Sequence, residues 1–128
     1  MERKSYYKWL FIIGALWNWL VSVPFFFWYD LIYARLSMQA LNYPATMQLA
    51  MALVFVFGIG YYWVSKDLSK NHDIVKLGII AKILVFLIFS YHYLFGNMPL
   101  MIALFSVVDL IFAILFIEFL KNTGKVKV

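Results

Sequence analysis

Four long apolar stretches limit what this chain can fold into more than any other feature. They cover about residues 9–29, 45–65, 74–95 and 98–120. As an α-helix rising about 1.5 Å per residue, each is long enough to cross a hydrocarbon core of about 30 Å. The 128 residues are 66% apolar and only 13% charged, which is too apolar for a soluble domain of this length. The sequence therefore predicts an all-α membrane protein, with residues 1–128 forming a single membrane domain.

The segment between the first two stretches is too short and too polar to span a membrane. Arg35, Gln39 and Asn42 interrupt the apolar residues of 31–42, and Asp30 is placed to cap a helix there. This pattern favours a short helix that lies at the membrane surface. The predicted fold is a four-transmembrane-helix up-down bundle, with a short interfacial helix between helices 1 and 2.

Basic residues lie almost entirely on one side of the four predicted spans. On that side are Arg3, Lys4, Lys8, Lys66, Lys70, Lys76, Lys121, Lys125 and Lys127, whereas the other side holds only Arg35. The positive-inside rule then places both termini and the turn at residues 66–73 in the cytoplasm. The net charge of +5 follows from this topological bias and gives no reason to expect a nucleic-acid partner.

Lys82 and Asp109 are opposite charges within the last two apolar stretches, which only Gly96-Asn97 separates. Lys82 lies about 14 residues before that turn and Asp109 about 12 after it, so in a helical hairpin their depths differ by roughly 3 Å. Ionisable groups inside a bilayer are costly and usually pair, face the bundle interior and mark functional sites. We expect these two side chains to meet.

Asn18 in the first stretch is expected at the same depth, so three helices would supply one polar layer. Gly14, Asn18 and Ser22 follow each other at four-residue spacing and form a small, polar stripe on one helix face. The layer has two main interpretations: a site for a small molecule, an ion or a proton, and a clamp that holds helices together. A third interpretation is that the two charges do not pair and instead snorkel separately to the lipid surface.

A second polar group is expected near the outer surface. His92, beside Tyr91, and Gln48 each lie about one turn from the outer end of a span. They would line an outer entrance, although an ordinary interfacial belt explains the histidine and tyrosine equally simply. Tyr61, Tyr62 and Trp63 are expected to form the corresponding belt at the inner surface.

Catalytic and cofactor motifs do not emerge from the residue pattern. The chain has no cysteine, which removes thiol chemistry, and His72 and His92 are too far apart along one helix to share a haem. We find no catalytic triad, no pair of catalytic carboxylates and no metal-ligand spacing, and we predict no cofactor. A non-enzymatic function is favoured, and an enzyme acting on a lipid or quinone is the weaker alternative.

Several short motifs together resemble a known group of proteins. They are Ala15-Leu16-Trp17-Asn18 with Pro24-Phe25, Phe57-Gly58-x-Gly60-Tyr61 leading to Asp67, Gly78-xxx-Lys82, and Asp109-xx-Phe112. The chain resembles the small four-helix integral membrane proteins of bacteria, and its general shape is similar to DoxX-like proteins and small multidrug-resistance transporters. The resemblance implies a bacterial inner-membrane location and carries no activity. Those transporters need an acidic residue in the first helix, where this chain has Asn18, so drug–proton antiport is in doubt.

The sequence leaves two main functions open. The first is a small membrane protein whose polar centre binds or transports a small molecule, an ion or a proton. The second is a structural or accessory subunit, with Lys82 and Asp109 as an interhelical clamp. The expected partners are membrane lipid and either further copies of the chain or another membrane protein. Four helices leave little room for a pore, so transport would require an oligomer.

Overall fold

The computed structural model describes residues 2–123, and within this range the regular secondary structure is helical, with no strands. The five helices are α1 (Glu2–Phe27), α2 (Tyr29–Arg35), α3 (Pro44–Lys66), α4 (His72–Phe95) and α5 (Leu100–Lys121). Four of them are long and apolar enough to cross a membrane, as the sequence predicts. The chain is therefore a small helical integral membrane protein.

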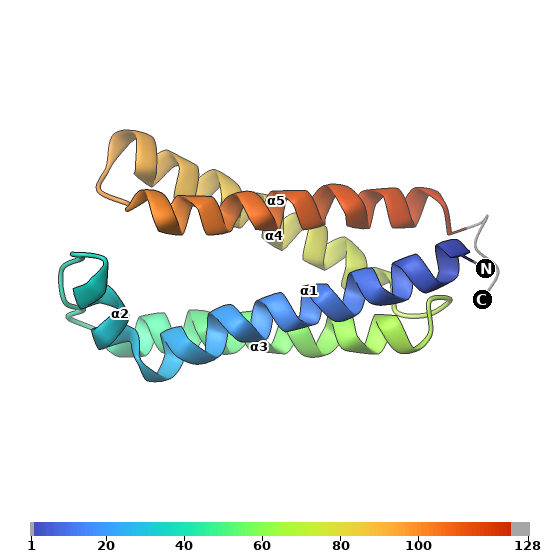
Figure 1. The fold of residues 1–128 in the computed structure, drawn as a ribbon, viewed down its shortest axis with the longest axis horizontal. Coiled ribbons are helices and arrows are strands. Elements are labelled where there is room, and N and C mark those ends of the chain that lie inside the picture. The colour runs from blue at the N-terminus through green and yellow to red at the C-terminus, as the bar shows by residue number, and fades with distance from the viewer. Residues whose placement is uncertain (1, 124–128) are drawn as a thin grey trace.

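The long helices pack as two pairs, α1 with α3 and α4 with α5 (Figure 1). The start of α1, the α3–α4 connection and the end of α5 lie at one end of the molecule, at the right of Figure 1. At the other end, the turn between α4 and α5 stands apart from α2 and from the α1–α3 pair. The two pairs therefore contact each other mainly between the middle of the molecule and the end where α1 begins.

The short helix α2 differs from its prediction in both length and capping. It spans Tyr29–Arg35 rather than residues 31–42, because Ser37 takes a positive φ of 58° that interrupts the helical backbone. Trp28 occupies the N-cap position, and the Asp30 carboxylate instead accepts a hydrogen bond of 2.8 Å from the backbone N–H of Leu31. Residues 38–42, which the pattern assigned to this helix, are not helical.

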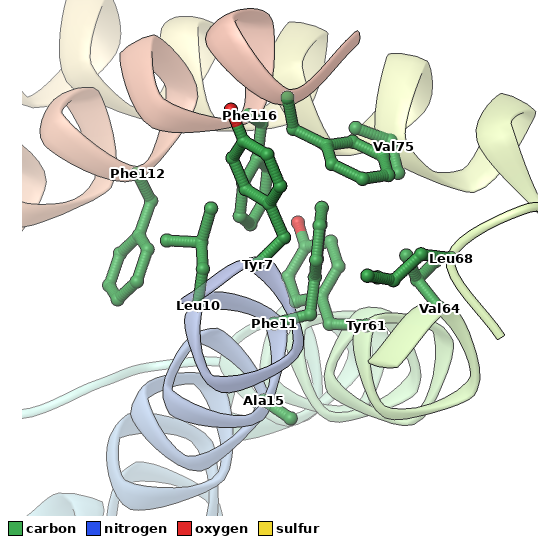
Figure 2. Close-up of a cluster of buried hydrophobic side chains, with 11 residues drawn as sticks. Tyr7, Leu10, Phe11, Ala15, Tyr61, Val64, Leu68, Val75, Phe112 and Phe116 are labelled. Carbon is green, nitrogen blue, oxygen red and sulfur yellow. The ribbon is translucent and has the colours of Figure 1, made fainter. Parts of the chain in front are cut away.

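Aromatic side chains dominate the core, which lies where the two helix pairs meet (Figure 2). The Phe11 ring of α1 stacks on Phe116 of α5 with centroids 4.7 Å apart, and it meets Phe119 edge-on at 4.9 Å. Tyr61 of α3 meets Phe116 at 5.1 Å, so three helices share one ring cluster. Tyr61 is 1% exposed, and its predicted place in the inner aromatic belt is wrong. Tyr62 and Trp63, its neighbours, are exposed.

The outer faces of the long helices are apolar and exposed. Leu20, Leu53, Leu87 and Ile114, one from each long helix, are between 55% and 70% exposed. In water, this much exposed aliphatic surface on a small protein would be costly. The pattern matches helices whose outward faces contact lipid tails rather than solvent.

Gly78 of α4 has no side chain, and this allows α4 to approach α3 of the other helix pair closely. A Cβ atom built there would lie 2.7 Å from the Tyr61 ring and from its hydroxyl oxygen. Tyr61 is enclosed by Phe116 and by the Lys82 ammonium group, 5.4 Å from its ring centroid. Because the ring has little room to move, a side chain at position 78 would separate α3 from α4.

We therefore expect Gly78→Ala to lower the free energy of unfolding by about 1–3 kcal/mol through overpacking. Gly14→Ala is the matched control, since its Cβ would lie at an ordinary contact distance of 3.4 Å from Phe116. Denaturant unfolding in detergent micelles, followed by circular dichroism, measures both. Equal stability of the two variants would contradict the close approach at Gly78.

Candidate functional site

The predicted pairing of Lys82 and Asp109 is confirmed. The Lys82 Nζ atom of α4 lies 2.8 Å from Asp109 Oδ1 of α5, and the two side chains are 5% and 17% exposed. Both positions lie near the middle of apolar helices, where water cannot solvate a charge. The tight turn between α4 and α5 folds the two helices together, and this brings the two charges to one depth.

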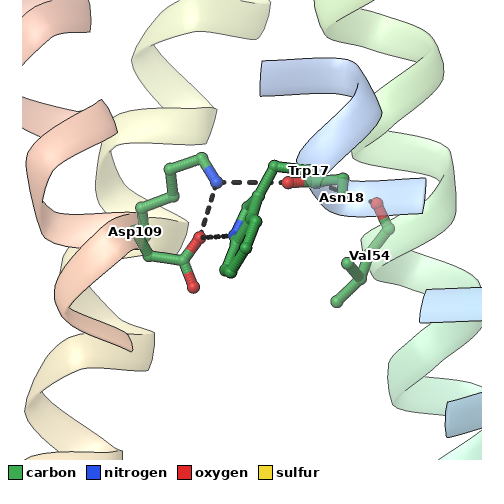
Figure 3. Close-up of polar contacts among 5 residues, drawn as sticks. Trp17, Asn18, Val54 and Asp109 are labelled. Atoms are coloured by element: carbon green, nitrogen blue, oxygen red, sulfur yellow. Dashed lines mark hydrogen bonds and ion pairs between the residues drawn. The ribbon is translucent and has the colours of Figure 1, made fainter. Parts of the chain in front are cut away.

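Asn18 of α1 joins the pair, as the shared depth predicts. Its Oδ1 atom accepts a hydrogen bond of 3.2 Å from Lys82 Nζ, and its Nδ2 atom donates to the Val54 carbonyl of α3 at 2.9 Å (Figure 3). Asn18 is 5% exposed, so its amide has exchanged water for these two partners. Through this one side chain, the ion pair of α4 and α5 is connected to both α1 and α3.

Trp17 belongs to the same group, and the sequence analysis missed its role. Its indole Nε1 atom donates a hydrogen bond of 3.2 Å to Asp109 Oδ1, while its ring meets Phe105 of α5 edge-on at 5.6 Å. Tryptophan in a membrane span is commonest at the two interfaces. The position of Trp17 in mid-span, beside Asn18, could have indicated this role, because a buried indole N–H needs a hydrogen-bond acceptor. We call Trp17, Asn18, Lys82 and Asp109 the charge network.

Two aromatic rings complete the surroundings of the lysine. Lys82 Nζ lies 5.4 Å from the ring centroid of Tyr61 and 5.2 Å from that of Phe112. At these distances the negative faces of the rings attract the ammonium group. With two hydrogen-bond acceptors and two rings around it, the Lys82 charge is compensated on several sides.

The Asp109 carboxylate is less completely enclosed than the lysine. Its Oδ1 atom accepts hydrogen bonds from both Lys82 and Trp17 (Figure 3), and among the described residues none reaches its Oδ2 atom. The side chain is also the more exposed of the pair, at 17%. A carboxylate oxygen with spare lone pairs can accept a further hydrogen bond or a proton. Asp109 is thus the member of the charge network that is best placed to meet another molecule.

The residues of the predicted outer entrance have separate surroundings. Gln48 Nε2 donates a hydrogen bond of 3.2 Å to the Phe26 carbonyl at the end of α1. The helix itself offers this carbonyl no backbone N–H partner. Tyr91 and His92 of α4 are exposed and pack on each other, with ring centroids 5.3 Å apart. In the described part of the chain no hydrogen bond joins Gln48 to either ring. The entrance stays a prediction.

The role of the charge network is not indicated by a metal site among the described residues or by a known relative. Within residues 2–123 no group of three His, Asp or Glu side chains is arranged to hold a metal ion. No family model, curated protein or solved structure matches the chain. The resemblance to small bacterial four-helix membrane proteins stays a prediction.

Replacing Trp17 by phenylalanine tests whether the indole stabilises the carboxylate. The variant keeps a ring against Phe105 but removes a hydrogen bond to a charged acceptor, worth about 1.5–3 kcal/mol. We expect a loss of unfolding free energy in that range, measured by denaturant unfolding in micelles. Trp63→Phe is the control, because Trp63 is 55% exposed. A loss at Trp63 as large as that at Trp17 would contradict the bond.

Proposed function

We propose that this chain is a small binding or transport protein of a bacterial inner membrane, with the charge network as its polar centre. The four long helices would cross the bilayer alternately up and down, and α2 would lie at its outer surface. The basic residues at the α1 start, in the α3–α4 turn and at the α5 end support a cytoplasmic location for that side. The proposed fold uses helix lengths that suit a bilayer of about 30 Å.

The unequal enclosure of the two charges is the observation that carries this function. Lys82 is held by Asp109, Asn18 and two rings, so its charge helps to fix the helices. The Asp109 side chain is three times as exposed as that of Lys82, and among the described residues only its Oδ1 atom accepts hydrogen bonds. A ligand at this centre would therefore be a proton, or a small polar molecule that donates an O–H or N–H group to Asp109.

The orientation can be tested because the chain contains no cysteine. In intact cells or spheroplasts, a membrane-impermeant maleimide should label Asn97→Cys from outside and should leave Ser69→Cys unmodified. Opening the cells should make Ser69→Cys reactive as well, since it lies in the α3–α4 turn. Labelling of Ser69→Cys in sealed cells, with Asn97→Cys protected, would reverse the proposed topology.

Substitution of the ion pair separates a site from a clamp. Lys82→Met alone should lower the unfolding free energy by about 3–5 kcal/mol, because it leaves the Asp109 charge buried without its partner. Lys82→Met with Asp109→Leu should be more stable than Lys82→Met alone, because no unpaired charge stays buried, although the Trp17 indole N–H then lacks its acceptor. Denaturant unfolding in micelles measures each variant against the wild type.

The stable double variant is then the correct control for function. In vesicles that contain a pH-sensitive dye, under a potassium diffusion potential, the wild type should change the internal pH faster than the double variant. If the ligand is a hydrogen-bonding solute and not a proton, its uptake into the same vesicles is measured for both variants. Equal rates for wild type, double variant and protein-free vesicles would contradict the transport function.

An accessory subunit is the second candidate, and the complete enclosure of Lys82 favours it. If the charge network acts only as a clamp, its bonds from α1 to α4 and α5 would hold the two helix pairs in one arrangement for a partner. Native mass spectrometry of protein released directly from membranes distinguishes this case. A fixed stoichiometric complex, together with full function of the double variant, would support the accessory function.

A further inference from the structure

A cavity lies at the end of the molecule where α1 begins and α3 ends. Its volume is about 310 Å³, and it is lined by Lys4, Lys8, Ser65, Lys66, Asp67 and Leu68. It is separate from the charge network, which lies near the middle of α1, α4 and α5. Three of the six lining residues are lysines, so the cavity has a strong positive charge.

The three lysines that line the cavity come from two packed helices, α1 and α3. Lys4 and Lys8 are four residues apart in α1 and therefore share one face of that helix. Lys66 is the last residue of α3, and its Nζ atom lies 5.2 Å from the ring centroid of Tyr62, which restrains the side chain. Within the described side chains, none of these three lysines forms an ion pair.

The one acidic residue of the cavity is engaged by its own turn. Asp67 Oδ1 accepts hydrogen bonds from the Ser69 hydroxyl at 2.6 Å and the Ser69 backbone N–H at 3.0 Å, and Lys70 lies 3.8 Å from Oδ2. The Ser69 hydrogen bonds, followed by the charges of Lys70 and Lys4, hold the pKa of the Asp67 carboxyl below its ordinary value. Asp67 thus stays ionised, and the three lysines still outnumber it.

We propose that this cavity binds a phosphate group, carried by the headgroup of an anionic phospholipid. The cavity lies at the ends of two apolar helices that are long enough to span a bilayer, so its depth is that of the headgroups. Basic pockets between helices at this level attract phosphate, at about 1 kcal/mol per lysine or arginine near an anionic surface. The inference is independent of the proposed function of the charge network.

Aromatic side chains at this end of α1 and α3 suit a membrane interface. Tyr6 and Trp9 of α1 are 46% and 56% exposed, and Trp63 of α3 is 55% exposed. Tyrosine and tryptophan are favoured where headgroups meet acyl chains, because their rings are apolar with one polar group. A free phosphate ion would use the lysines alone, whereas a phospholipid would also place its acyl chains against the apolar outer faces of the helices.

Native mass spectrometry of the full chain in micelles tests the proposal with phosphatidylglycerol as the probe. The wild type should retain one phosphatidylglycerol at concentrations where zwitterionic phosphatidylcholine is not retained. The site variant combines Lys4→Gln, Lys8→Gln and Lys66→Gln, and it should bind phosphatidylglycerol at least about tenfold more weakly. The control variant combines Arg35→Gln, Lys76→Gln and Lys121→Gln, which removes the same charge from exposed residues elsewhere and should leave affinity unchanged.

Circular dichroism of both variants checks that their helices are intact, so that weaker binding reports on the cavity. An equal loss in the two variants would overturn the proposal, because binding would then follow net charge alone. Equal retention of the two lipids by the wild type would also overturn it. Inorganic phosphate that binds the wild type as tightly as the lipid, and not the site variant, would support the phosphate site with free phosphate as its source.

Discussion

The ion pair between Lys82 and Asp109 imposes the strongest constraint on this structure. Moving either charge alone out of water costs several kcal/mol even after the protein relaxes, so neither residue can remain inside apolar helices without a partner. The pair meets at 2.8 Å and recruits Asn18 and Trp17 from α1. Satisfying two charges in a medium without water therefore fixes the position of α1 relative to α4 and α5.

Helix α1 consequently performs two packing functions along its length. Its first half supplies Phe11 to the aromatic core with Phe116 and Phe119, where burial and ring contacts hold the helix pairs together. Its middle supplies Trp17 and Asn18, whose hydrogen bonds are directional and restrict rotation of the helix about its axis. The aromatic core gives contact area, and the charge network selects one arrangement of the helices.

Much of this arrangement could be predicted from the sequence because a bilayer restricts backbone choices to helices of known rise. The short Gly96-Asn97 turn and that rise were sufficient to place Lys82 beside Asp109, and depth alone indicated Asn18. The rotation of each helix could not be read in the same way. The indole of Trp17 and the rings of Tyr61 and Phe112 reach the ion pair only in the observed rotations. The length of α2 depends on the positive φ of Ser37, a local backbone choice without a sequence period.

The distribution of polar groups along α1 connects the interior of the protein to the membrane surface. Lys4 and Lys8 lie on the first turns beside the cavity, and Asn18 lies nearly three turns beyond Lys8 in the charge network. Both contacts act on the same rigid helix, which also packs along α3. An anion held by the lysines would link α1 to the end of α3 and would oppose sliding or rotation of α1 against α3. Such movement is the one that would break the bonds of Asn18 and Trp17 and leave the Asp109 carboxylate open to a ligand.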